Sequence, residues 1–339
     1  MALRRLGTLL FLSVLGIKPV LGAEGSGWES GKAGWESGKA GWKSGKAGWE
    51  SGKAAFEVHY KGESSPFSVN GVFLMPGEIL DLKISGRQSG TFSLEFAKGT
   101  GGPAGPRAWN WKAPDTSGLY TLTLRRDSTD DRVRFNAFVM IPAAEMKGEY
   151  LRGYRIGKYP GTPLKGLEFY RNPKGFILAD SVSVNARVSP HFRLGQFLCK
   201  QSAELPAVLL LKERLVLKLE MVLEKANEAG YPCNTFHVMS GYRTPFYNKA
   251  IGNVKLSAHQ FGGAADIFID NAPVNGEMDD LNGDGISDGL DSGLLFDLVD
   301  KLSVNEYFLP YIGGIGKYSK NRSHGAFVHV DVRGFRVIW

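Results

Sequence analysis

The 339-residue sequence lacks several features that would assign its class directly. It has only two cysteines and no Cys-x-x-Cys pair, which excludes a zinc site built on cysteine pairs. After the N-terminal segment, no apolar run reaches the ~18 residues that a membrane-spanning helix needs. The 41 basic residues outnumber the 34 acidic ones, but no Arg/Lys-rich arm occurs, so we expect no nucleic-acid partner. The remaining composition is typical of a soluble globular protein of two domains.

The first 22 residues predict export. Arg4 and Arg5 precede an apolar run at residues 6–16, and small residues before Ala23 offer a cleavage point. This is the pattern of a secretory signal peptide, and the absence of a nearby cysteine argues against a lipid anchor. We therefore expect a protein of the periplasm or cell envelope. An excess of positive charge suits the anionic polymers found there.

The two cysteines, Cys199 and Cys233, lie far from any metal-binding partner motif. In an oxidising compartment a pair of cysteines is commonly bonded, and two buried thiols are the alternative. We expect one disulfide that stabilises the fold and takes no part in catalysis.

Residues 23–55 are dominated by a repeat. The heptapeptide Gly-Trp-Glu-Ser-Gly-Lys-Ala occurs four times between residues 27 and 54, with Lys43 in place of Glu in the third copy. Two glycines per repeat oppose a helix, so the seven-residue period does not indicate a coiled coil. The composition predicts a flexible linker. The alternative is that its tryptophans stack on sugar rings or lie at a membrane surface.

Residues 56–145 show short alternating runs of apolar and polar residues, which predict an all-β domain. We expect strands at 67–73, 80–84, 91–96 and 119–124, and a long glycine-rich loop at 98–105. The approach to Tyr120 resembles the tyrosine corner of immunoglobulin-like sandwiches. This β-sandwich is expected to contact the cell wall or a protein, or to act as a spacer.

Residues 146–187, rich in Gly, Pro, Tyr and Lys, are interpreted as a connector to a C-terminal domain, residues 188–339. Apolar spacing predicts a helix at 208–229. A strand is expected at 235–239. His191 and His237 are interpreted as structural histidines outside any metal site.

Three residues of this domain suit a catalytic zinc ion. His259 and Asp266 lie seven residues apart with four small residues between them, and His329 lies in a later strand-like run. Zinc accepts imidazole and carboxylate ligands, and three protein ligands leave a fourth position for water. The sequence therefore predicts a zinc site of His259, Asp266 and His329.

The motif Ser257-x-His-x-x-Gly-x-Ala-x-Asp266 resembles the metal motif of the zinc D-Ala-D-Ala carboxypeptidase family, which shares its fold with Hedgehog proteins. The segment 240–245 and the closing segment 327–331 with terminal Trp339 fit the same family, closest to its murein endopeptidase branch. The resemblance implies an α+β domain of the Hedgehog/DD-peptidase type that acts on peptidoglycan peptide stems.

The resemblance also implies further site residues. Arg243 matches the arginine that contacts the substrate carboxylate or the polarised carbonyl, and a guanidinium suits that role because it stays charged. Many relatives carry an acid three residues before the last ligand, where this chain has Ala326. Asp331 and His324 are then the candidates for the general base, and Asp331 is equally a candidate for orienting a ligand.

A second ion site is predicted between these motifs. Residues 280–291 place oxygen ligands at the spacing of an EF-hand loop, with Gly285 at the turn position. Asp replaces the usual final Glu. A calcium ion would be held by Asp280, Asn282, Asp284, Ile286, Asp288 and Asp291, with no catalytic role.

Taken together, the sequence predicts an exported, zinc-dependent endopeptidase for peptidoglycan cross-links. The alternatives are a D,D-carboxypeptidase and a wall-binding protein that keeps the zinc site without hydrolysing anything.

Overall fold

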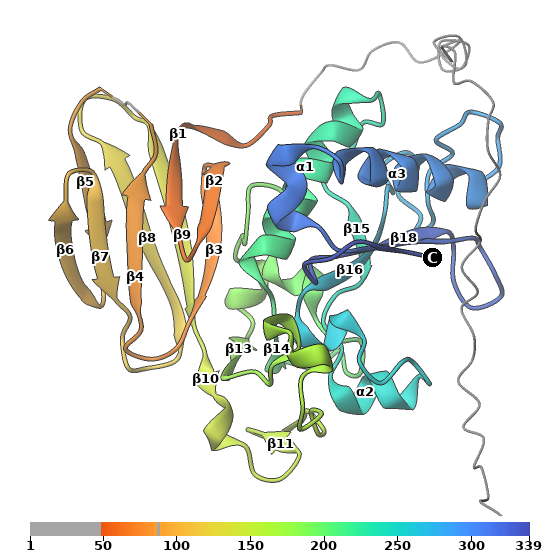
Figure 1. Ribbon diagram of the computed structural model, residues 1–339, viewed down its shortest axis with the longest axis horizontal. Coiled ribbons are helices and arrows are strands. Elements are labelled where there is room, and N and C mark those ends of the chain that lie inside the picture. The colour runs from red at the N-terminus through yellow and green to blue at the C-terminus, as the bar shows by residue number, and fades with distance from the viewer. Residues whose placement is uncertain (1–48, 87–88) are drawn as a thin grey trace, which may run out of the picture. The chain divides into compact units, whose positions relative to one another are not determined.

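A computed structural model describes residues 49–86 and 89–339, which form a mixed α+β chain (Figure 1). The described residues belong to one compact unit. The predicted signal peptide and most of the predicted linker lie outside the described residues. Within the described part, no helix has the length and apolar character required to cross a bilayer.

The N-terminal half of the unit consists of two sheets (Figure 1). The first has the order β2-β1-β4-β7-β6. Its strands are β1 (Lys53–Tyr60), β2 (Glu63–Phe67), β4 (Ile79–Ile84), β6 (Thr100–Gly105) and β7 (Ala108–Lys112). The second sheet, β3-β9-β8-β5, comprises β3 (Val69–Leu74), β5 (Phe92–Phe96), β8 (Gly118–Arg126) and β9 (Arg132–Val139).

The two sheets bury a shared core, as a sandwich requires. In β4 the side chains alternate, so that Leu80, Leu82 and Ile84 are buried while the residues between them face solvent. They meet residues of the other sheet such as Phe135, together with Trp111 of β7. The alternation of apolar and polar residues expected from the sequence is therefore present in β4.

Two details of the predicted sandwich were wrong. The glycine-rich segment 98–105 was expected to be a loop, but most of it forms the edge strand β6. Its glycines allow this pairing, because a Cβ on Gly101 would lie only 2.2 Å from the Asn110 carbonyl oxygen. The strand expected at 67–73 is instead divided at Ser68, between β2 and β3.

The expected connector, residues 146–187, is in part core structure. Strand β13 (Gly175–Ala179) pairs with both β10 (Ile141–Pro142) and β14 (Ala207–Leu209). A small hairpin precedes it, formed by β11 (Tyr150–Leu151) and β12 (Tyr154–Arg155).

Short 3-10 turns occur along the chain, at Ala143–Glu145, Leu164–Gly166, Glu168–Tyr170, Ser183–Asn185, Leu194–Phe197, Ala258–Phe261 and Glu306–Tyr311.

The C-terminal half is built on a second five-stranded sheet in the order β15-β16-β18-β17-β19. Its strands are β15 (His237–Ser240), β16 (Ala264–Phe268), β17 (Gly314–Tyr318), β18 (Phe327–Asp331) and β19 (Val337–Ile338). Neighbouring strands are antiparallel, apart from the parallel β17/β19 pair. The helices are α1 (Glu213–Glu228), α2 (Pro245–Ala250) and α3 (Gly289–Leu302).

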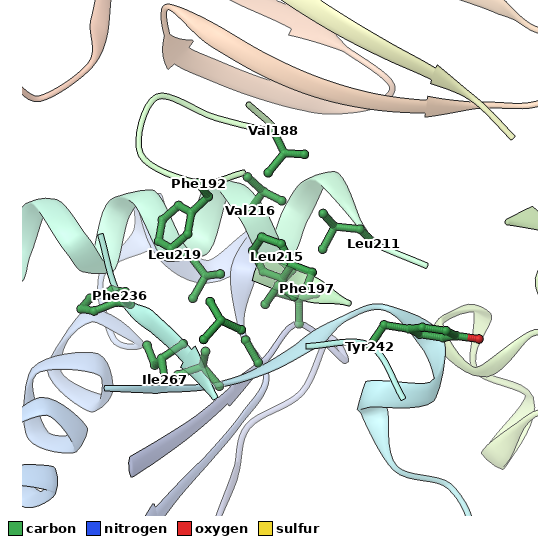
Figure 2. Close-up of a cluster of buried hydrophobic side chains, with 14 of the residues drawn as sticks. Val188, Phe192, Phe197, Leu211, Leu215, Val216, Leu219, Phe236, Tyr242 and Ile267 are labelled. Atoms are coloured by element: carbon green, nitrogen blue, oxygen red, sulfur yellow. The ribbon is translucent and has the colours of Figure 1, made fainter. Parts of the chain in front are cut away.

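Helix α1 carries the core of this half. The helix was predicted to begin at residue 208, but it begins at Glu213. The first apolar residues of the predicted helix, including Val208, instead form β14 and pair with β13. Figure 2 shows Leu215 and Leu219 of α1 above Ile267 of β16, all of them buried.

The predicted disulfide is wrong. Both Cys199 and Cys233 are free and buried. The Cys199 thiol contacts Gln201, whereas Cys233 follows α1 and its backbone is held by the Asn227 side chain. Each thiol is accommodated as a small core side chain. Burial raises the pKa of the Cys233 thiol to about 12, which keeps it protonated.

The two histidines interpreted as structural do lie outside the metal-ligand group. His191 Nδ1 lies 2.7 Å from the buried Glu220 carboxylate. His237 stacks on Phe268 and lies 3.4 Å from Asp270.

The tyrosine corner is formed as expected and gives a first prediction. The Tyr120 hydroxyl donates to the Thr116 carbonyl oxygen at 3.0 Å, closing the approach to β8. Tyr120→Phe should lower the free energy of unfolding by about 1 kcal/mol, since it removes one hydrogen bond. Urea titration measures the change. Tyr307→Phe is the control, because that ring is exposed and its hydroxyl has no hydrogen bond within the described residues. Equal effects of the two substitutions would contradict the corner's role.

Candidate metal centre

The sheet places two of the predicted ligands side by side. Asp266 of β16 and His329 of β18 are direct cross-strand partners. His259 reaches them from the 3-10 turn Ala258–Phe261, which ends at Gly262 with a left-handed φ of +67°. A Cβ on Gly262 would lie 2.6 Å from the Leu210 backbone, so only glycine allows the chain to turn back here.

The three side chains converge on one point. His259 Nε2 lies 3.1 Å from His329 Nδ1 and 3.2 Å from Asp266 Oδ1, and the last two atoms lie 2.9 Å apart. Tetrahedral zinc with bonds of about 2.0–2.1 Å separates its ligand atoms by roughly 3.3 Å. The observed triangle is close to that size, and all three residues are buried.

The outer hydrogen bonds decide which ring nitrogens face the centre. His259 Nδ1 lies 2.7 Å from the Gly241 carbonyl oxygen, which can only accept, so this nitrogen carries a proton. His329 Nε2 lies 3.1 Å from Asp331 Oδ2 and is protonated for the same reason. In the neutral rings, the remaining nitrogens each point a lone pair at the centre, beside the Asp266 carboxylate. Three lone pairs meeting in a buried space fit a cation.

The carboxylate of Asp266 is kept ionised. Burial by itself raises its pKa, but the adjoining imidazoles of His259 and His329 favour the ionised carboxylate more strongly and hold the pKa well below its usual range. Arg243 adds to this, because its guanidinium hydrogen-bonds to Asp266 Oδ2. An anionic ligand is therefore available at neutral pH.

Asp331 orients His329 instead of facing the centre. Its carboxylate is fully buried and accepts from the Gly314 backbone N–H at 2.7 Å and from the Arg333 guanidinium. Burial raises the pKa of Asp331, but His329 and Arg333 outweigh it and hold the pKa low. A carboxylate with every oxygen occupied is a poor general base, so of its two expected roles the structure favours ligand orientation.

Arg243 lies beside Asp266. Its Nε donates to Ser240 Oγ at 2.8 Å, and its guanidinium reaches Asp266. His324, the other candidate base, bonds within its own loop. Its ring nitrogens lie 2.8 Å from the Gly325 carbonyl oxygen and 2.7 Å from Asn321 Nδ2.

Sequence reasoning missed the groups that surround Asp331. Arg333 lies two residues after Asp331, just beyond the end of β18, and its positive charge near that carboxylate in sequence was the available signal. Gly314 gave no such signal, although a Cβ there would lie 2.5 Å from Asp331 Oδ2. Lys218 of α1 is fully buried and donates to the Asp331 backbone carbonyl oxygen at 2.8 Å.

The predicted calcium loop is organised around its own backbone. Asp280 accepts from the Gly283 and Gly285 N–H groups, both at 2.7 Å. Asp291 accepts from the Leu281 N–H at 2.7 Å and from the N–H of Asp288, the N-cap residue of α3, at 2.8 Å. Among the described residues, the group of His, Cys, Asp or Glu that could hold an ion is the His259–Asp266–His329 triad. Calcium binding at 280–291 stays a prediction.

Comparisons with known proteins add little. No family model matches this sequence, and no curated protein matches it. Among solved structures, the titin M3 domain matches with 14% identity, covering 25% of this chain and 97% of that domain, at a TM-score of 0.17. A likeness this weak supports no conclusion about the chain.

The geometry predicts that the triad binds one divalent ion tightly. At a free ion concentration of 100 times the Kd, binding should stabilise the fold by about 2.7 kcal/mol. Thermal unfolding with zinc and with a chelator measures this shift. His329→Ala should abolish the shift, whereas His324→Ala should keep it. A zinc-dependent shift that survives His329→Ala would place the ion elsewhere.

The buried Lys218 predicts a pH dependence. Burial lowers its pKa from 10.5 to about 8, against the opposing charge of Asp331. Between these pH values the unfolded chain binds more protons than the folded one, so the free energy of unfolding rises with pH. From pH 7 to 9.5, wild type should gain roughly 2 kcal/mol relative to Lys218→Met. Urea titrations of both proteins at the two pH values test this, and a constant difference would contradict a depressed pKa.

Proposed function

We propose that this chain is an exported zinc peptidase that hydrolyses peptide cross-links of peptidoglycan. The observation that carries the proposal is the convergence of two imidazole nitrogens and one carboxylate oxygen in a buried triangle. Three protein ligands leave a fourth coordination position, as in catalytic zinc sites, whereas structural sites are closed by four. Zinc at such a site lowers the pKa of bound water and polarises a carbonyl.

The family resemblance agrees with this geometry. The residues at the centre, His259, Asp266 and His329, are those of the motif shared with zinc D-Ala-D-Ala carboxypeptidases and murein endopeptidases. Their support on an antiparallel sheet covered by helices is compatible with a Hedgehog/DD-peptidase domain. The peptidoglycan substrate and the preference for cross-links over terminal D-alanine rest on that resemblance.

The residues of this chain have distinct proposed roles. Asp331 and Arg333 hold the His329 ring in the orientation that presents Nδ1. Arg243 supplies a fixed positive charge beside the Asp266 ligand, where it can also bind a substrate carboxylate or a carbonyl that becomes negative. Of the two candidate bases, Asp331 is enclosed and His324 has both ring nitrogens engaged by Gly325 and Asn321, so His324 would have to give up one of these contacts to act as the base.

The N-terminal half is proposed to be an immunoglobulin-like sandwich that contacts the wall or a protein. If β1, β4, β5, β6, β7, β8 and β9 are taken as strands A to G, the sheets read ABED and CFG, with β2 added beside A and β3 beside G. This is the strand order of constant-type immunoglobulin domains. Export to the periplasm or envelope rests on the N-terminal sequence pattern.

A wall-binding protein without hydrolysis is the second candidate. Ala326 stands where many relatives carry an acid, and Arg243 is engaged with the ligand Asp266. Both observations favour a site that binds without turning over.

The deciding experiment is incubation of the mature protein with intact peptidoglycan, with and without a zinc chelator. Mass spectrometry of the released muropeptides identifies the broken bond. Chelator-sensitive conversion of cross-linked dimers to monomers would support the endopeptidase, and loss of terminal D-alanine alone would indicate the carboxypeptidase. Unchanged peptidoglycan, with zinc present in the protein, would favour the binding protein.

Two substitutions should separate the roles within the site. His259→Ala should abolish cleavage through loss of the ion. Arg243→Lys should keep the ion but lower kcat/KM by about 10²-fold, since a lysine lacks the forked donors that stabilise developing charge. His237→Ala, outside the triad, is the control and should leave both ion content and rate unchanged. Full activity of Arg243→Lys would remove the arginine from the mechanism.

A further inference from the structure

The fourth copy of the heptapeptide repeat is bound to the folded unit. The Trp49 ring stacks on His191, with ring centroids 5.8 Å apart and planes inclined by 17°. The Glu50 carbonyl oxygen lies 2.9 Å from His191 Nε2. Lys53 forms an ion pair with Glu224 of α1. A repeat expected to be a linker therefore has one copy with specific partners, and residues 49–55 correct that expectation.

The His191 ring on which Trp49 stacks is held in place by Glu220. The buried Glu220 carboxylate accepts from the His191 backbone N–H at 2.8 Å and lies 2.7 Å from its Nδ1. Burial lowers the pKa of His191, but Glu220 outweighs burial and the pKa is raised. The imidazole is thus held in one orientation, with its Nε2 directed at the peptide.

The folded unit contacts the fourth copy at repeat positions that are the same in all four copies. The contacts use the tryptophan at position two, the backbone carbonyl at position three and the lysine at position six. Position five must be glycine, because Gly52 has a φ of +64° and a Cβ there would lie 2.3 Å from Pro190 Cβ. The one position that varies among the copies is position three, where Lys43 replaces Glu. Position three contacts His191 only through its backbone carbonyl oxygen, so replacing its side chain does not alter this contact.

We propose that Pro190, His191, Glu220 and Glu224 form a binding site for the Gly-Trp-x-Ser-Gly-Lys unit, and that the third copy, residues 41–47 of the same chain, exchanges with the fourth copy there. We refer to these four residues as the repeat site. When the third copy replaces the fourth, the bound segment moves seven residues towards the N-terminus. The free chain that precedes the repeat site is then seven residues shorter, which reduces its reach by at most about 25 Å. The repeat then acts as a tether of adjustable length.

Strand β1 can accommodate the shift. Lys53 pairs with Phe67, but the next pair is Val58 with Ser65, and the register is irregular between them. Seven looped residues inserted at this point leave the pairing beyond Val58 intact. Closing a seven-residue loop lowers the population of the shifted register by a factor of about 20. The fourth copy therefore dominates in the wild-type chain.

Zero-length carbodiimide coupling of the full chain tests the exchange, because it joins a carboxylate only to an amine in contact with it. In wild type, Glu224 should couple to Lys53. Trp49→Ala/Lys53→Ala disables the fourth copy, and coupling of Glu224 to Lys46 should then rise by roughly tenfold or more. Peptide mass spectrometry distinguishes the products. The Lys225–Glu228 ion pair on the same helix is the internal reference and should couple equally in all variants.

Adding Trp42→Ala to the double variant disables the third copy as well and should return Glu224–Lys46 coupling to the wild-type level. Absence of Glu224–Lys46 coupling in the double variant, with normal Lys225–Glu228 coupling, would overturn the proposal. A mixture of ¹⁴N- and ¹⁵N-labelled chains identifies the donor chain. Mixed-label Glu224–Lys46 products would overturn exchange within one chain.

Discussion

The cross-strand pairing of Asp266 with His329 is the constraint on which the rest of the centre depends. It fixes His329 Nδ1 and Asp266 Oδ1 2.9 Å apart in a buried space. Because both atoms carry lone pairs, this distance is favourable only when a proton or a cation lies between them. The turn that ends at Gly262 brings His259 to the same point. Gly241, Asp331 and Arg243 then hold these three side chains in orientation through hydrogen bonds.

The support for His329 extends through the whole C-terminal half. Asp331 holds the ring, Arg333 neutralises Asp331, and Lys218 of α1 binds the Asp331 backbone. Buried charges are costly unless they are paired, so this chain of contacts couples the position of α1 to the metal ligands. Helix α1 also carries Glu224, which pairs with Lys53 of the fourth repeat copy, and Glu220, which orients the His191 ring on which Trp49 stacks. One helix therefore links the site, the core and the end of the tether.

The alternating strands of the N-terminal half and the three residues of the triad could be predicted because each depends on local pattern or on residue type. Predictions failed where a distant segment competed for the same residues. Val208 was assigned to a helix but pairs with β13, and the glycine-rich segment 98–105 forms a strand because β7 lies beside it. The disulfide between Cys199 and Cys233 was inferred from compartment alone, and each thiol instead fills its own place in the core.

The sequence by itself determined which atoms are available to bind a metal ion, since the chemistry of imidazole and carboxylate is carried by the residue types. It also determined the repeat and the alternating patterns, which are local properties of the chain. Only the tertiary structure decided the direction of each lone pair, the enclosure of Asp331 and the binding of Trp49 on His191. These depend on hydrogen bonds and contacts between residues far apart in sequence, which no local pattern encodes.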